Sequence, residues 1–187
     1  MVKKSVTCIS LLFIGYGISY FCLDYCRGIK DLNNNELLIG KYFDNDSDKR
    51  AVNKVDYSAV LEIPKIKFKR GLFDIDSKDN NLEKNIVFLD KSDMPNENNS
   101  RVIIVGHSGD TSNSYFKYLY KIKFKDILYL YYNNTKYTYK VTDIYEIKKT
   151  GKLALESNNN KTLTLVTCKG SDKQLVIIST LYKEEKL

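Results

Sequence analysis

The stretch that most limits what this chain can fold into is residues 161–168, a run of threonine, leucine and valine that ends on a cysteine. β-Branched and aliphatic residues that alternate between two faces predict a β-strand. One face would carry Thr162, Thr164, Val166 and Cys168, and the other Leu163, Leu165 and Thr167. The following Lys-Gly-Ser-Asp, residues 169–172, predicts a turn. A thiol at the end of a strand, just before a turn, is placed where a substrate can reach it.

A second predicted strand, residues 101–107, also ends on a reactive side chain. It reads Arg-Val-Ile-Ile-Val-Gly-His, and His107 is the only histidine in the chain. Two strand ends that carry a thiol and an imidazole suggest a catalytic Cys/His pair brought together across a sheet.

Each of these residues also has a simpler interpretation. A single cysteine in a strand is commonly a core residue, and a single histidine is commonly a surface residue. A zinc site is the other option, but it usually needs four ligands, and residues 57–187 contain no second cysteine or histidine. The two strand ends together favour the catalytic pair of His107 and Cys168.

Four short motifs resemble the sortases, the cysteine transpeptidases of Gram-positive bacterial surfaces. Thr-Leu-Val-Thr-Cys at 164–168 is similar to their cysteine signature, and Val-Gly-His-Ser-Gly at 105–109 is similar to their histidine strand. Tyr-Phe-Lys-Tyr-Leu at 115–119 and Val-Leu-Glu-Ile-Pro-Lys-Ile at 60–66 resemble two further family segments. The resemblance runs from Tyr57 to Leu181. In its short chain and its His-Ser-Gly triplet the sequence resembles class B or class D of the family, and the class stays open.

The resemblance implies a fold and a reaction. The fold is an eight-stranded β-barrel, and the reaction is cleavage of a C-terminal sorting motif of the Leu-Pro-x-Thr-Gly type. Cys168 would form a thioacyl-enzyme, and His107 would act as general acid and base. The implied partners are surface proteins that carry a sorting signal and an amine acceptor, such as a peptidoglycan precursor or a pilin lysine. No cofactor is implied.

The sequence departs from the family at one position. The family has a substrate-binding arginine near the start of the last strand, but the arginines here are Arg27, Arg50, Arg70 and Arg101, all before the cysteine. Gln174 aligns with the arginine and Lys173 lies beside it, so either side chain is a candidate replacement. Losing one oxyanion donor costs about 100- to 1000-fold in rate. Thr167 is expected to help hold the substrate carbonyl.

This departure leaves two other functions open. One is a catalytically weak or inactive sortase-like module that only binds peptides or wall material. The other is a hydrolytic cysteine peptidase of the same fold.

The N-terminal part of the chain predicts a membrane anchor. Residues 5–23 contain no charge and would span about 28 Å as a helix, close to a hydrocarbon core of about 30 Å. A cleaved signal peptide is the alternative, but no small-x-small cleavage site follows. We therefore expect a cytoplasmic tail at 1–4, a single-pass span at 5–23, a polar stalk at 24–56 with one short helical turn at 37–43, and an extracellular catalytic domain at 57–187.

The remaining pattern predicts a mainly β domain of about eight short strands with few helices. Residues 59–64 predict a strand, 70–71 a turn, 85–89 a short strand and 115–120 one or two helical turns. Two tyrosine-rich runs, 126–132 and 136–141, flank Asn-Asn-Thr and predict a tight hairpin. Residues 148–160 predict a loop, and 174–179 the last strand.

Composition excludes several functions. The net charge of +7 is spread over isolated lysines, so we expect no nucleic-acid partner, and we interpret the strand tyrosines as barrel wall rather than a base-stacking platform. Cys8, Cys22 and Cys26 lie in or beside the apolar segment, so Cys168 has no partner for a disulfide within its domain. Some family members bind calcium near the loop before the cysteine strand, but the segment 148–152 is basic here. We expect no metal.

Overall fold

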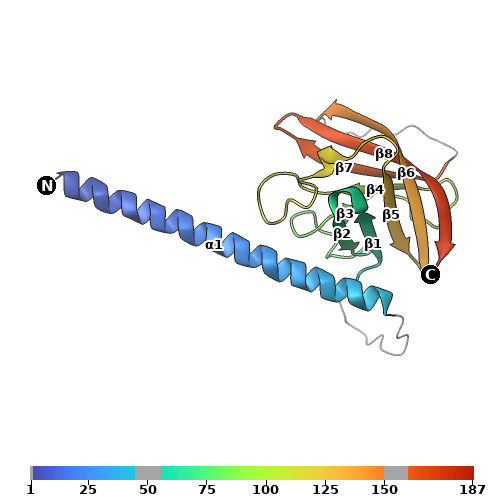
Figure 1. The fold of residues 1–187 in the computed structure, drawn as a ribbon, viewed down its shortest axis with the longest axis horizontal. Coiled ribbons are helices and arrows are strands. Elements are labelled where there is room, and N and C mark those ends of the chain that lie inside the picture. The colour runs from blue at the N-terminus through green and yellow to red at the C-terminus, as the bar shows by residue number, and fades with distance from the viewer. Residues whose placement is uncertain (1, 45–55, 150–159) are drawn as a thin grey trace.

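The computed structural model describes residues 2–44, 56–149 and 160–187. One eight-stranded sheet, in the order β2-β1-β5-β6-β8-β7-β4-β3, curls into a nearly closed barrel (Figure 1). The elements are α1 (Val2–Phe43), β1 (Ala59–Ile63), the 3-10 turn η2 (Pro64–Ile66), β2 (Phe68–Leu72), β3 (Val87–Phe88), β4 (Arg101–Val105), the 3-10 turn η3 (Leu119–Lys121), β5 (Ile127–Tyr132), β6 (Thr135–Lys148), β7 (Thr162–Lys169) and β8 (Lys173–Lys186). The predicted mainly β barrel is confirmed.

The barrel interior is filled by the apolar face of each strand. Leu61, Leu130, Ile104 and Leu165 are fully buried in one cluster. A second, smaller cluster contains Ile103, Val166 and Val176. Each of these residues is next in the sequence to a residue of the interior cluster. Because side chains alternate along a strand, this second cluster lies on the outer face of the sheet.

Strand β7 lies between β4, which runs parallel to it, and β8, which runs antiparallel. A parallel pair ends at the same edge of the sheet, so the carboxyl ends of β4 and β7 lie together. This topology places the two predicted reactive residues at one end of the barrel.

The predicted hairpin is confirmed. Strands β5 and β6 are joined by Asn133 and Asn134, whose φ angles of 46° and 59° are those of a type I′ turn. Tyr137 and Tyr139 are buried in the core cluster, as the barrel-wall interpretation predicts.

The turn predicted at residues 70–71 is wrong. Arg70 and Gly71 lie inside β2, which pairs with β1, and the chain reverses earlier, at η2 and at Lys67 with its φ of 52°. Gly71 is needed for packing instead: a Cβ there would lie 1.8 Å from the ring of Tyr57. The glycine therefore marks a close approach of side chain to backbone inside a strand, and not a turn.

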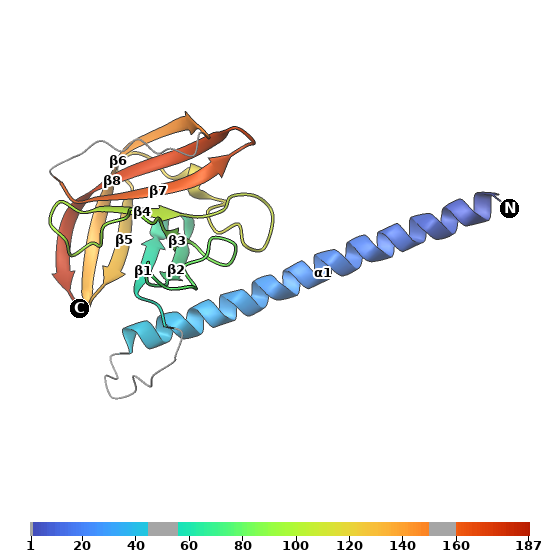
Figure 2. The same ribbon diagram turned by 180° about the vertical axis from the view of Figure 1, so that it is seen from behind.

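Helix α1 is longer than the sequence indicates. The sequence predicts a single helical turn at 37–43 within a polar stalk, but the helix runs without interruption to Phe43. Its C-terminal part lies beside β2, and its N-terminal part extends away from the barrel (Figures 1 and 2). Among the described residues, no helix has both the length and the apolar character of a membrane span. Residues 45–55 of the predicted stalk lie outside the described part.

The segment after the histidine strand is less helical than predicted. It forms turns followed by η3, yet Phe116 and Leu119 are both fully buried, as their spacing indicates. The loop predicted at 148–160 begins later, because β6 continues to Lys148, and residues 150–159 lie outside the described part.

Candidate active site

The ends of β4 and β7 bring His107 level with Cys168. The last paired residues are Val105 and Val166, and the ladder continues by one bond, in which Gly106 N donates to Val166 O at 3.2 Å. Two residues beyond this pair, the parallel register reaches His107 on one strand and Cys168 on the other.

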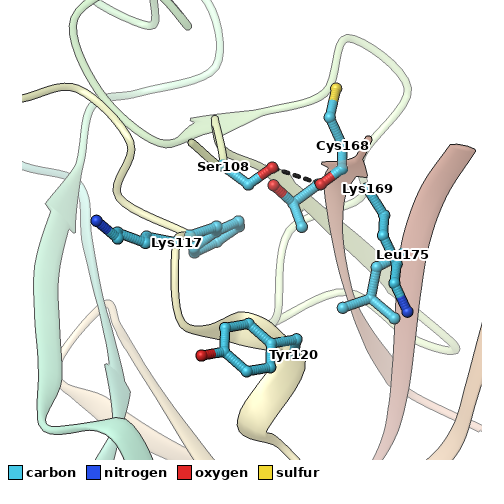
Figure 3. A pocket seen from close by; sticks show the side chains of 8 residues that line it. Ser108, Lys117, Tyr120, Cys168, Lys169 and Leu175 are labelled. Carbon is cyan, nitrogen blue, oxygen red and sulfur yellow. Dashed lines mark hydrogen bonds between the residues drawn. The ribbon is translucent and has the colours of Figure 1, made fainter. Parts of the chain in front are cut away.

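Two side-chain hydrogen bonds join the backbones of these strand ends. The hydroxyl of Thr167, which is buried, donates to Gly106 O at 2.7 Å, and the hydroxyl of Ser108 donates to Cys168 O (Figure 3). These bonds attach the neighbours of His107 to Cys168 and its neighbour, so both residues have a fixed backbone.

The glycine before His107 permits a close approach. A Cβ at Gly106 would lie 2.7 Å from the ring of Phe116 and 2.9 Å from Ile86. A larger residue there would displace the strand end from the core.

The thiol of Cys168 is free and partly exposed. By alternation it shares the outer face of the sheet with Val166, and its sulfur points away from Tyr120 and Leu175 (Figure 3). Cys22 and Cys26, on α1, are also free and are exposed.

His107 is held by different contacts. Its backbone oxygen accepts a hydrogen bond from Phe116 N at 2.9 Å, and its Nε2 lies 3.4 Å from a carboxylate oxygen of Glu83. The side chain of His107 is 32% exposed and that of Glu83 is 77% exposed. Within the described residues, no hydrogen bond joins the imidazole to the thiol of Cys168. The predicted pair therefore occupies one sheet edge without a hydrogen bond between the two side chains.

The two candidate arginine replacements lie on opposite faces. Gln174 is the direct partner of Cys168 in the β7–β8 ladder, so the two side chains share a face. Lys173 points the other way, and its Nζ lies 3.4 Å from Glu146. Glu146 also bonds Lys169, and the hydrogen bonds from the two ammonium groups lower its pKa.

A cavity of about 200 Å³ opens beside Cys168. Its lining combines apolar, aromatic and cationic side chains: Ser108, Phe116, Lys117, Tyr120, Thr167, Cys168, Lys169 and Leu175. Lys117 pairs with Asp110 at 2.7 Å. Of the four predicted site residues, Cys168 and Thr167 line this cavity, whereas His107 and Gln174 are not part of its lining.

In the described part of the chain, no three His, Cys, Asp or Glu side chains gather to hold a metal ion. The basic segment 148–152, on which the expectation of no metal depends, lies mostly outside the described residues.

Two residues at this site were not identified from the sequence. Ser108 follows His107 in the His-Ser-Gly triplet, so its position beside the histidine was a usable signal. Glu83 lies 24 positions before His107 in a polar stretch with no recognisable motif. Only the fold brings its carboxylate to the imidazole.

Comparisons with known proteins agree with the fold. A family model described as a sortase domain matches residues 61–181. The structure is similar to a Clostridium perfringens sortase D5 transpeptidase, with a TM-score of 0.64 and 22% identity, over 82% of this chain and 98% of that one. It is also similar to sortase A from Listeria monocytogenes, with a TM-score of 0.59 and 22% identity, over 70% of this chain and 90% of that one. Comparison with curated protein sequences finds no match.

Proposed function

Because the chain belongs to the sortase family, we propose that it is a cysteine transpeptidase whose nucleophile is Cys168. The observation that supports this most is the position of a free, partly exposed thiol at the end of β7, level with His107 at the end of β4. The hydrogen bonds from Thr167 and Ser108 hold the two strand ends in this arrangement. A nucleophile on a fixed strand can be aimed at one carbonyl.

The first step is acyl transfer to the enzyme. The Cys168 thiolate attacks the carbonyl carbon of the threonine in a sorting motif of the Leu-Pro-x-Thr-Gly type. The new S–C bond forms, the scissile C–N bond breaks, and the protonated His107 gives its proton to the departing amine. The product is a thioacyl-enzyme and a released C-terminal peptide.

The second step transfers the acyl group to an amine. His107 takes a proton from the incoming amine, whose nitrogen attacks the thioester carbonyl. The C–N bond forms and the C–S bond breaks, which restores Cys168. The amine belongs to a peptidoglycan precursor or to a lysine of another surface protein.

We assign the oxyanion contact to Gln174. It shares a face with Cys168, and its amide can donate a hydrogen bond, although it brings no charge. Lys173 is bound to Glu146 on the opposite face. Thr167 contributes to the substrate site through its methyl group, or through its hydroxyl oxygen as an acceptor, because the hydroxyl proton is donated to Gly106 O.

Two observations favour a second candidate, a weak or inactive domain that only binds peptides. No arginine follows the cysteine in the sequence, and His107 and Cys168 share no hydrogen bond in the described structure. A binding domain needs no activated thiol, and this separates the two candidates.

Intact-protein mass spectrometry tests the proposal. The full chain is incubated with a library of sorting peptides, with and without an added amine such as triglycine. A transpeptidase gains the acyl mass on Cys168 and yields an amine-linked product. A hydrolytic peptidase yields the free acid regardless of the amine. A chain that binds peptides without any acyl adduct is the inactive module.

We further propose that residues 5–23 anchor the protein in the cell membrane with the barrel outside. The support is the uncharged stretch and the large apolar side chains that α1 exposes, among them Phe13, Tyr16 and Phe21. Protease added to intact protoplasts should digest the barrel. Protection of the barrel would mean the opposite topology.

A further inference from the structure

Helix α1 is seated on β2 by a buried asparagine. Asn35 is 5% exposed. Its side-chain amide donates to Lys69 O at 3.2 Å, and its side-chain oxygen accepts from Gly71 N and from the Tyr57 hydroxyl, both at 3.2 Å. A buried amide with three hydrogen-bond partners specifies the position of the helix.

One turn earlier on the helix, Asp31 neutralises a buried charge. Arg70 is 4% exposed, and two of its guanidinium nitrogens each donate to an Asp31 oxygen at 2.8 Å. The third nitrogen, Nε, donates to Asn85. A bidentate pair of this kind fixes orientation as well as distance. Within the described part, Asp31 is the only carboxylate paired with Arg70, so the barrel depends on the helix for this counterion.

Arg70 also contacts the segment that follows His107. Its guanidinium stacks on the ring of Tyr115 at 3.6 Å from the ring centre. The hydroxyl of Tyr115 donates to Lys84 O at 3.0 Å, and burial raises the pKa of Tyr115 to about 12, so this hydroxyl keeps its proton near neutral pH. Tyr115 therefore joins the helix-bound arginine to the loop that carries Glu83.

A second set of contacts runs parallel to the first. Ser112 donates to the carboxylate of Asp24, on α1, at 2.7 Å, and Asn113 donates to the backbone oxygen of Glu83 at 3.2 Å. Residues 112–115 are thus held between the helix on one side and residues 83–84 on the other.

Both sets of contacts end at His107. The Glu83 carboxylate lies 3.4 Å from Nε2 of the imidazole, and Phe116, next to Tyr115, donates its N–H to the His107 carbonyl. The imidazole and the backbone of His107 are therefore each held by a segment that α1 holds in turn.

We propose that Asp31 is a positioning residue for His107, acting through Arg70, Tyr115 and Glu83, and that the part of α1 from Asp24 to Asn35 belongs to the active-site scaffold. This inference rests on the proposed function, because the histidine it positions is the proposed general acid and base. It means that the barrel cut from its helix has its cysteine strand intact but its histidine misplaced.

The single histidine makes the test direct. In the full chain without a histidine tag, imidazole resonances in an NMR spectrum belong to His107 alone. We expect Asp31→Asn to shift or broaden them and to lower kcat for peptide cleavage about 10- to 100-fold with KM little changed, since misplacing a reacting group by about 1 Å has an effect of this size. Asp31→Glu should bring the His107 resonances and kcat part of the way back to those of the unchanged chain. Glu36→Gln, the same charge change at an exposed site on the same helix, is the matched control and should alter neither.

Tyr115→Phe keeps the ring under Arg70 and removes the hydrogen bond to Lys84 O. If Asp31→Asn does not fold, the His107 resonances of Tyr115→Phe test the inference instead. If the folded variants give His107 resonances that overlay those of the unchanged chain, the inference is overturned. The NMR result does not depend on turnover. An inactive chain with a displaced His107 resonance in Asp31→Asn would overturn the proposed function and leave this inference standing.

Discussion

The two proposed catalytic side chains are held in different ways. Cys168 lies on β7, a strand with backbone partners on both sides, in β4 and β8. His107 lies beyond the end of β4, and the groups that hold it come from the loop segments 83–84 and 112–116 and, through them, from helix α1.

This difference matches the proposed chemistry. A nucleophile must meet one carbonyl in one geometry, and a strand inside a sheet provides that rigidity. A general acid and base must serve a departing amine and then an arriving one. Side-chain contacts on loops permit small adjustments that a backbone ladder does not. The cysteine is therefore held by its strand, whereas the imidazole of His107, whose backbone is also bonded to the neighbouring segments, is held by a side chain from a loop.

The largest expected effect is on the cysteine side. Cys168→Ala should abolish the acyl-enzyme and turnover, because no other group in the site can form the thioester. The control is a triple substitution of Cys8, Cys22 and Cys26 by Ala, which should leave activity unchanged. Intact mass and a peptide-cleavage assay measure both. Retained turnover in Cys168→Ala would contradict the assignment of the nucleophile.

A smaller effect is expected at the residue opposite the cysteine. Gln174→Ala should slow acylation by up to about 100-fold without eliminating it, because it removes one neutral donor from the oxyanion. Lys173→Ala, on the other face, should be nearly silent, and Gln174→Arg should raise the rate where space allows. Single-turnover acylation rates measure all three. A severe loss in Lys173→Ala with a silent Gln174→Ala would assign the contact to the cation instead.

The hydrogen bonds that join the two sides should differ in strength. Thr167→Val removes a buried donor and leaves Gly106 O unpaired, at a cost of about 1–3 kcal/mol in the free energy of unfolding. Ser108→Ala removes a partly buried one, at about 0.5–1.5 kcal/mol. Denaturant titration of each variant measures these costs. Equal and negligible costs would mean that the backbone ladder alone aligns the strand ends.

The smallest expected effect is a change of stability with pH that comes from Tyr115, in the segment that contacts His107. Burial raises the pKa of Tyr115 from 10.0 to about 12, so folding favours its protonated form. The stability that this gives is complete below about pH 10 and is lost as the pH rises towards about 12. We compare the free energy of unfolding of the unchanged chain with that of Tyr115→Phe. The difference between the two should be constant from about pH 7 to about 9.5 and should become smaller at higher pH. A stability difference that grows with pH would contradict the burial of the Tyr115 hydroxyl.

The sequence by itself determined the features that depend on near neighbours in the chain. Alternation along 161–168 and 174–179 gave the faces of Cys168 and Gln174, and the observed register keeps them together. The Asn-Asn pair specified the hairpin, because few residues other than glycine adopt its positive φ angles at low cost. The family motifs indicated the eight-stranded barrel, whereas the order of its strands comes from the structure.

Tertiary structure alone decided the rest. In the sequence, the polar residues of 24–43 are typical of a solvated stalk, but in the structure Asp31 and Asn35 bind partners on β2. Likewise, Arg70 lies in a predicted turn, but in the structure it lies in a strand and is paired with a carboxylate from the helix. Glu83 has no local pattern that marks it as a neighbour of His107. Such contacts join residues as far as 88 positions apart, as between Asp24 and Ser112. Periodicity reports only which face a residue occupies, whereas the burial and pairing of a polar group depend on what the rest of the chain places against it.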